Sequence, residues 1–184
     1  MADFHVTVFC ASSPSGPRKQ EFLDLAERFG TMLAGAGFRC VNGGTHGMMT
    51  ALCRGAYQAG GHVTGILIDP KRFIPEHNFH HTTEEFEGIV LRQARLLEMG
   101  DAFVALPGGV GTLYEVAQVV AMKSLDEIPT EKPMICVGNT WGNLKAHFQE
   151  MVDAGLCFRD PFDQVTFVAT PEEAIEILKT HRGS

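Results

Sequence analysis

The sequence predicts an α/β fold: a single doubly wound, Rossmann-like domain in which a parallel sheet is flanked by helices. Short apolar segments alternate with longer amphipathic segments along the whole chain, which is the pattern of parallel strands joined by crossover helices. Glycine-rich turns follow two of the apolar segments. The length of 184 residues fits one nucleotide-binding domain, spanning residues 1–184, with a sizeable core.

Strands are expected where apolar runs are short and bounded by turn residues. They are residues 5–10, 38–42, 63–68, 101–106, 134–137 and 165–168. Helices are expected where apolar residues recur every three to four positions. They are residues 18–36, 47–59, 84–99, 114–122, 144–154 and 171–180. Residues 70–83 contain proline, histidine and asparagine and are predicted to form an irregular surface loop.

Composition and charge exclude several classes of protein. The formal net charge is −7 and the pI is about 5.6, so no nucleic-acid partner is expected. No apolar run approaches the ~18 residues of a membrane helix, and the first residues lack the basic opening of a signal peptide. The five cysteines include no Cys-x-x-Cys pair. The cysteine pattern favours reduced thiols in the core of a cytoplasmic protein. The absence of a long apolar run favours a protein without a membrane partner.

Residues 106–115, Leu-Pro-Gly-Gly-Val-Gly-Thr-Leu-Tyr-Glu, are the most informative segment. They join a predicted buried strand to a predicted helix. At such a junction backbone N–H groups lack partners and the helix dipole adds partial positive charge, so the turn suits a phosphate. Gly108, Gly109 and Gly111 let the backbone approach an anion closely, and the Thr112 hydroxyl can donate a hydrogen bond to it.

Glu115 ends this segment. A carboxylate beside a phosphate site is repelled by the phosphate, so its presence there suggests a functional role. The alternative interpretation is an ordinary first-turn glutamate, which the helix dipole stabilises. A functional role makes Glu115 a candidate catalytic group.

Two further strand ends support a phosphate-bearing ligand. Residues 9–14 place Ser13 in a turn, and residues 42–49 place Gly43 and Gly44 in a second glycine-rich turn before a helix. One such turn is weak support, because glycine also serves ordinary turns, but several at the strand ends of one sheet indicate a phosphate site. Neither glycine-rich turn has the dinucleotide pattern Gly-x-Gly-x-x-Gly and no Gly-Lys-Ser/Thr occurs, so neither a dinucleotide cofactor nor a P-loop is expected.

Three segments stand out: Phe-Cys-Ala-Ser-Ser-Pro at 9–14, Gly-Gly followed by Gly-Met-Met at 43–49, and Pro-Gly-Gly-Val-Gly-Thr-Leu-Tyr-Glu at 107–115. In these segments the chain resembles the Lonely Guy family of cytokinin riboside 5′-monophosphate phosphoribohydrolases. Members of this family were once labelled lysine decarboxylases. The family pairs the glutamate with an arginine on the preceding helix, so the resemblance assigns Arg92 and Glu115 as the catalytic pair. Gln93 stands where the family has lysine, and Asn42 where its turn has a first glycine. These departures leave the identity of the base open.

The resemblance implies hydrolysis of the N-glycosidic bond of a nucleoside 5′-monophosphate, a cytokinin riboside monophosphate or AMP-like nucleotide, to free base and ribose 5-phosphate. It implies a homodimer and no cofactor or metal. Cleavage builds positive charge on the ribose, and Glu115 would stabilise that charge or orient the attacking water. Arg92 would hold the phosphate or assist the leaving base. Without the resemblance, Arg92 would be interpreted as a solvated helix charge.

Two other functional classes stay open. The first is a non-catalytic nucleotide or cofactor carrier on the same fold, which would gain nothing from a carboxylate near the ribose. The second is a lysine decarboxylase, which needs a lysine bound to pyridoxal phosphate in an elaborate site. No such site is visible among the few lysines of the sequence.

Three histidines, His77, His80 and His81, fall within the predicted loop. Their spacing matches no common zinc pattern, and no cysteine or carboxylate completes a set. The loop is therefore expected to cover the nucleotide rather than to bind a metal. Arg95 lies one turn after Arg92 and is expected to share its face of the helix.

Overall fold

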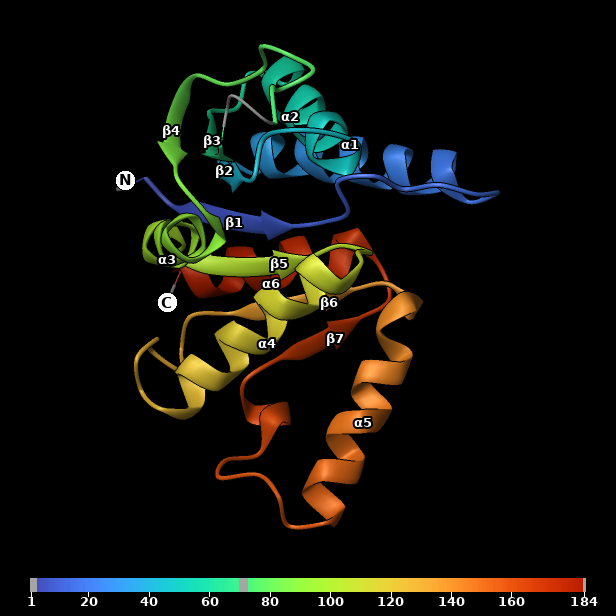
Figure 1. The fold of residues 1–184 in the computed structure, drawn as a ribbon, viewed down its shortest axis with the longest axis vertical. Coiled ribbons are helices and arrows are strands. Elements are labelled where there is room, and N and C mark those ends of the chain that lie inside the picture. Colours follow the sequence, from blue (N-terminus) through green and yellow to red (C-terminus); the bar gives the residue numbers. More distant parts are fainter. Residues whose placement is uncertain (1–2, 70–72, 184) are drawn as a thin grey trace.

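The computed structural model describes residues 3–69 and 73–183. Within them the chain forms a seven-stranded parallel sheet with helices on both faces (Figure 1), which confirms the predicted fold class. The strands are β1 (His5–Phe9), β2 (Arg39–Asn42), β3 (Val63–Ile68), β4 (Thr82–Phe86), β5 (Ala102–Ala105), β6 (Met134–Val137) and β7 (Thr166–Val168). The helices are α1 (Lys19–Gly35), α2 (Met48–Gln58), α3 (Ile89–Met99), α4 (Val110–Ser124), α5 (Gly142–Asp153) and α6 (Pro171–Gly183).

The order of the strands in the sheet is β4-β3-β2-β1-β5-β6-β7. The chain builds outward from β1 to β4 and then crosses to β5 on the other side of β1. The topological switch point therefore lies between β1 and β5, and in open α/β sheets ligands bind beyond the carboxyl ends of the strands at that point. In the register of the sheet Val8 lies opposite Asn42 of β2 and Val104 of β5, so these three strand ends are level.

Successive side chains of β1 point to opposite faces of the sheet. Val6 and Val8 belong to the core layer under α1, α2 and α6, whereas Phe9 packs in the layer under α3, α4 and α5. The buried Thr7 hydroxyl donates a hydrogen bond of 2.9 Å to the carbonyl of Leu96 in α3, so its burial leaves no unpaired donor. Among residues 3–69 and 73–183, no helix has the length and apolar character needed to span a membrane.

The prediction was wrong at one edge of the sheet. Residues 82–86 form β4, parallel to β3, where the sequence predicted a loop to residue 83 and a helix from residue 84; α3 begins only at Ile89. An edge strand has one neighbour and keeps its side chains largely in water. Thr-Thr-Glu-Glu-Phe therefore shows no apolar alternation to reveal it. Residues 70–72 of the predicted loop lie outside the described residues.

Helix α4 begins at Val110, four residues before the predicted start. Gly111 and Thr112 therefore lie in its first turn, and Glu115 lies in its second. The glycine-rich segment is thus partly a turn and partly the opening of the helix.

Glycines bring α1 and α2 into backbone contact. A Cβ at Gly30 of α1 would collide with the carbonyl oxygen of Leu52, and a Cβ at Gly55 of α2 would collide with that of Glu27. No side chain separates the two helices at these points. This contact fixes α2, which opens beside the predicted ligand site.

We expect Gly55→Ala to lower the free energy of unfolding by about 1–3 kcal/mol, because the added methyl group forces α2 away from α1. This loss outweighs the ~1 kcal/mol by which alanine is the better helix former. Gly35→Ala in α1 is the matched control, because no atom lies within 4 Å of a Cβ there, and it should be neutral or stabilising. Urea denaturation measures both, and an unchanged midpoint for Gly55→Ala would contradict the close packing.

Candidate active site

A cleft of about 470 Å³ opens at the carboxyl ends of β1 and β5. It lies at the switch point of the sheet, where a ligand site is expected. Its walls come from the turn after β1 and the first turns of α2, α3 and α4, with the residues Cys10, Ala11, Ser12, Ser13, Pro14, Met49, Ile89, Arg92, Gly109, Val110, Gly111, Thr112 and Glu115. A larger hollow of about 560 Å³ lies beside Met134 at the opposite end of β6, away from these groups.

Arg92 enters the cleft from the first turn of α3 and is 8% exposed. Its Nε donates a hydrogen bond of 2.8 Å to the carbonyl oxygen of Ile66 in β3. A Cβ at Gly43 would collide with its Nη2, so the glycine provides the space that the guanidinium fills. Burial lowers the pKa of Arg92 and Glu115 acts in the opposite direction. An arginine remains protonated at neutral pH even so.

Glu115 faces Arg92 from the second turn of α4. Its Oε1 lies 4.0 Å from Nη1 of Arg92, and its side chain is 13% exposed. The separation is too long for a hydrogen bond, so the two groups interact by charge alone. Burial raises the pKa of Glu115 to about 7, and the attraction of Arg92 opposes this only in part. The carboxyl group therefore titrates near neutral pH, which suits acid–base chemistry.

The first turn of α4 presents its backbone to the cleft. Gly109 is the N-cap, and no side chain caps the helix. No atom lies within 4 Å of a Cβ at Gly109 or Gly111, and both residues line the cleft. A helix N-terminus of this kind suits an anion. Gly108 has a different role, because a Cβ there would collide with the side chain of the buried Thr112.

The cleft brings together most of the predicted site residues: Ser13, Arg92, Gly109, Gly111, Thr112 and Glu115. Gly43 and Gly108 lie behind Arg92 and Thr112, and a Cβ at Gly44 would lie 2.6 Å from Nε2 of His80. These three glycines shape the site from behind. Their direct contact with a ligand stays a prediction.

The structure adds side chains that the sequence did not single out. Cys10 lines the cleft, and burial, assisted by the charge of Glu115, raises the pKa of its thiol. Met49, Ile89 and Val110 give the cleft an apolar wall. Each of these four residues lies next to a recognisable turn, and this position is the only feature of the sequence that could have predicted its place in the cleft. Arg95, predicted on the same helix face as Arg92, does not line the cleft and donates hydrogen bonds to Glu84 at 2.8 and 2.9 Å.

A doubly wound sheet, an uncapped helix N-terminus at its switch point and a buried Arg–Glu pair are features of nucleotide-binding α/β proteins with catalytic groups. The family model described as "Possible lysine decarboxylase" matches residues 49–178. The chain belongs to this family.

Comparison with known proteins agrees with the family assignment. A cytokinin riboside 5′-monophosphate phosphoribohydrolase from Rhodococcoides fascians is 39% identical over 123 residues, which are 65% of this chain and 61% of the relative. The protein of that name from Mycobacterium tuberculosis is 30% identical over 180 residues, 94% of this chain and 92% of the relative. The molybdenum cofactor carrier protein from Chlamydomonas reinhardtii matches the fold with a TM-score of 0.74 over 100% of both chains at 22% identity. The two phosphoribohydrolases confirm the Lonely Guy resemblance, whereas the carrier protein shows only that the fold is shared.

Glu115 makes the stability of the protein depend on pH. Because its pKa is raised from 4.5 to about 7, the folded state holds this proton longer than the unfolded state does. The folded state therefore loses stability as pH rises through this interval. Glu115→Gln removes the penalty, so we expect the variant to gain up to about 3 kcal/mol relative to the wild type between pH 4.5 and pH 8. Urea denaturation across this range measures the gain, and a difference independent of pH would contradict it.

Proposed function

We propose that the protein hydrolyses the N-glycosidic bond of a nucleoside 5′-monophosphate, a cytokinin riboside monophosphate or AMP-like nucleotide. The products are the free base and ribose 5-phosphate. The observation that carries the proposal is the meeting of Arg92 and Glu115 in the cleft that also holds the uncapped start of α4. The names of the relatives support the same reaction.

The spacing along α4 suits such a substrate. Gly109 and Glu115 are about 9 Å apart along the helix axis, at 1.5 Å per residue. A 5′-phosphate on the backbone N–H groups of Gly109 and Gly111 places the ribose toward Glu115, because helical side chains lean toward the N-terminus. The apolar wall of the cleft is left for the base.

The chemistry requires a negative charge near the ribose. As the C–N bond breaks, its electron pair leaves with the base and the ribose ring becomes cationic. Ionised Glu115 stabilises this cation or accepts a proton from the water that bonds to the same carbon. Both roles use the carboxylate form, so activity rises as pH passes the pKa of Glu115.

Arg92 has two roles that agree with its position. As a cation in a buried site it either holds the phosphate or donates a hydrogen bond to the departing base. Its hydrogen bond to Ile66 fixes Nε, which leaves the Nη atoms for the substrate.

Two other functions have weaker support. A carrier would share the fold, as the molybdenum cofactor carrier does, but a carrier gains nothing from a carboxylate that is costly to bury. A lysine decarboxylase needs a lysine in its site, and the described residues that line the cleft include none.

We further propose that the protein is a cytoplasmic homodimer without a nucleic-acid partner. Val90, Leu91 and Val110 are 70%, 61% and 84% exposed beside the cleft on α3 and α4, and a second copy would bury them. All five cysteines are free, which agrees with a reducing compartment. The net charge of −7 disfavours binding to a nucleic-acid backbone.

Glu115→Gln keeps the shape of the side chain and removes its charge. We expect turnover to fall by about 10²–10³-fold, the usual effect of losing one well-placed electrostatic stabiliser. The measurement is chromatographic detection of base released from AMP and from a cytokinin riboside monophosphate. Glu127→Gln, an exposed residue beyond α4, is the control and should keep full activity. Full activity of Glu115→Gln would exclude the proposed mechanism.

Arg92→Ala distinguishes the two roles of the arginine. A fall in kcat comparable to that of Glu115→Gln indicates action on the leaving base, whereas a raised KM with little change in kcat indicates a grip on the phosphate. Unchanged kcat and KM would remove Arg92 from the site.

The assembly is tested by light scattering at micromolar concentration. We expect the wild type to show about twice the chain mass of 20.1 kDa. Leu91→Glu should dissociate it by placing a charge in the interface, whereas Leu156→Glu, on a more exposed leucine elsewhere, should not. An active wild type with the mass of a single chain would contradict the dimer.

A further inference from the structure

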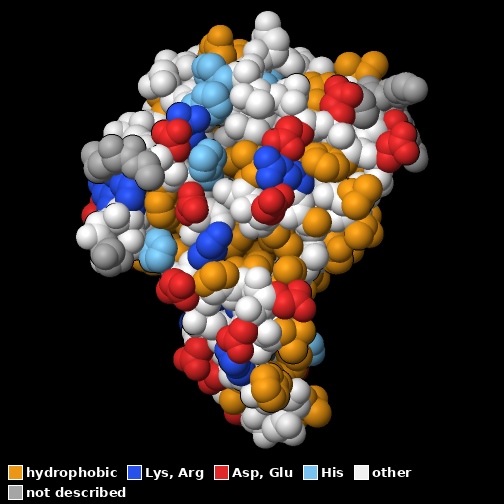
Figure 2. All heavy atoms as spheres, turned by 90° about the vertical axis from the view of Figure 1, so that its left-hand side faces the viewer, with side chains coloured by type: hydrophobic (Ala, Val, Ile, Leu, Met, Phe, Trp, Pro, Cys, Tyr) orange, Lys and Arg blue, Asp and Glu red, His pale blue; other side chains and the backbone are white. Residues whose placement is uncertain are grey.

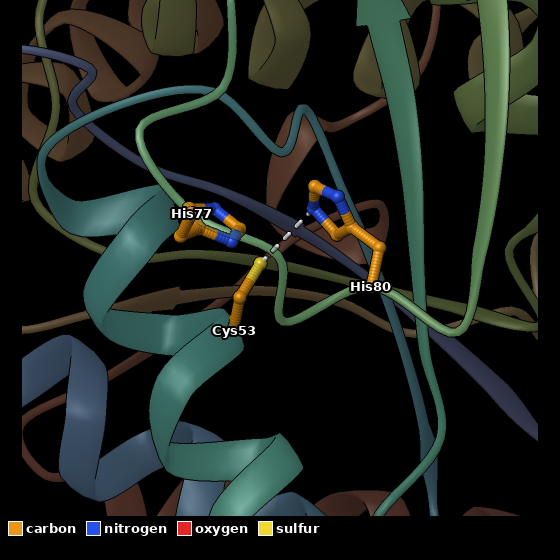
Figure 3. Close-up of side chains that lie close together, drawn as sticks. All are labelled: Cys53, His77 and His80. Carbon is orange, nitrogen blue, oxygen red and sulfur yellow. Dashed lines mark hydrogen bonds between the residues drawn. The ribbon is translucent and has the colours of Figure 1, made fainter.

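A second group of chemically active side chains lies behind the Gly43–Gly44 turn. Cys53 of α2 and two histidines of the segment between β3 and β4, His77 and His80, point toward one another (Figure 3). One ligand atom from each lies within 4.8 Å of the others. The sequence analysis considered the two histidines but not Cys53 as their partner, because a whole strand separates this cysteine from them in the chain.

His80 occupies a space that two glycines leave open. A Cβ at Gly44 would lie 2.6 Å from its Nε2, and a Cβ at Gly65 would lie 2.8 Å from the same atom. The Nε2 atom is 3.6 Å from Sγ of Cys53. The imidazole is therefore packed against the turn after β2 and the middle of β3 and does not project into solvent as a mobile cover.

His77 carries a polar atom without a partner. Its Nδ1 accepts a hydrogen bond of 3.1 Å from the backbone N–H of Phe79. A neutral imidazole that accepts at Nδ1 has its proton on Nε2, and this Nε2 is buried with no hydrogen-bond partner among the residues that the structure describes. An unpaired buried N–H is unfavourable and calls for an explanation, such as an ion.

We propose that Cys53, His77 and His80 bind one divalent cation of the zinc type, with water as the fourth ligand. Thiolate sulfur and imidazole nitrogen are both ligands that Zn²⁺ takes in proteins, and three protein ligands plus one water is the pattern of an open zinc site. On binding, the Cys53 thiol releases its proton to solvent and its sulfur donates an electron pair to the cation. Coordination through Nε2 of His77 moves the ring proton to Nδ1, so the Phe79 N–H turns away.

The surroundings of the cluster favour this chemistry. The side-chain amide of Asn42 donates a hydrogen bond of 3.2 Å to Sγ of Cys53, which stabilises a thiolate from the outer shell. Asn42 is the residue that replaces a glycine of the Lonely Guy pattern.

The alternative location for a metal ion is the surface. Histidine side chains gather on one face near the end of the molecule that holds α2 and β4 (Figure 2), and the rings of His62 and His81 stack at 4.9 Å. Such a pair can take up metal weakly without a built site. An experiment must therefore separate the two clusters.

The test titrates the metal-free full-length protein with Co²⁺ and with Zn²⁺ in competition with a chromogenic chelator. We expect one ion per chain, with a thiolate-to-cobalt charge-transfer absorption. Cys53→Ser should abolish this absorption. His80→Phe, which keeps a ring in the glycine-lined space, should weaken binding by at least about 100-fold, because even outer-shell changes cost 10–100-fold. Cys157→Ser and His81→Gln are the matched controls and should bind as the wild type does.

Three results would overturn the proposal: no stoichiometric binding, a charge-transfer absorption that persists in Cys53→Ser, or binding lost in His81→Gln but kept in His80→Phe. Circular dichroism of each variant checks its fold. Should Cys53→Ser not fold, Cys53→Ala and His80→Phe answer the same question.

Discussion

The burial of Arg92 and Glu115 is the constraint on which the rest of the site depends. Removing two charges from water is costly, and their attraction at 4.0 Å without a hydrogen bond offsets only part of that cost. The carbonyl of Ile66 and the space at Gly43 stabilise the arginine. Within residues 3–69 and 73–183 no hydrogen bond reaches the carboxylate of Glu115, and burial raises its pKa to about 7. A group held in this state is poised to be stabilised by positive charge that develops on a substrate.

That arrangement requires close backbone packing where the strands end. Gly47 has a φ of +60°, and a Cβ there would collide with the carbonyl of Ser12. The N–H of Met48 donates a hydrogen bond of 3.1 Å to the carbonyl of Ala11. The turns after β1 and β2 are thereby joined, and the level register of β1, β2 and β5 places both beside the start of α4. Glycines in these turns are therefore needed for close backbone packing as well as being candidates for ligand contact.

The sequence predicted the central strands and the cleft motifs because burial and turn chemistry leave strong local patterns. It missed β4, whose existence depends on pairing with β3 and not on its own five residues. It predicted that Gly43 binds the ligand, and it did not predict that Arg92 fills the space beside this glycine. Cys53 has the pattern of a core helix residue, and only the three-dimensional fold brings it to His80. Interactions between distant segments were therefore the part that local pattern could not supply.

Both sites depend on one short turn. Gly43 borders the guanidinium of Arg92, and Gly44 borders the ring of His80. Asn42 links them, because its Oδ1 accepts a hydrogen bond of 2.6 Å from the N–H of Gly44 while its amide group donates to Cys53. Asn42 therefore contacts both the thiol of Cys53 and the backbone of the turn that leaves space for Arg92. The packing around this turn thus provides a short physical connection from the proposed metal ligands to the proposed catalytic pair.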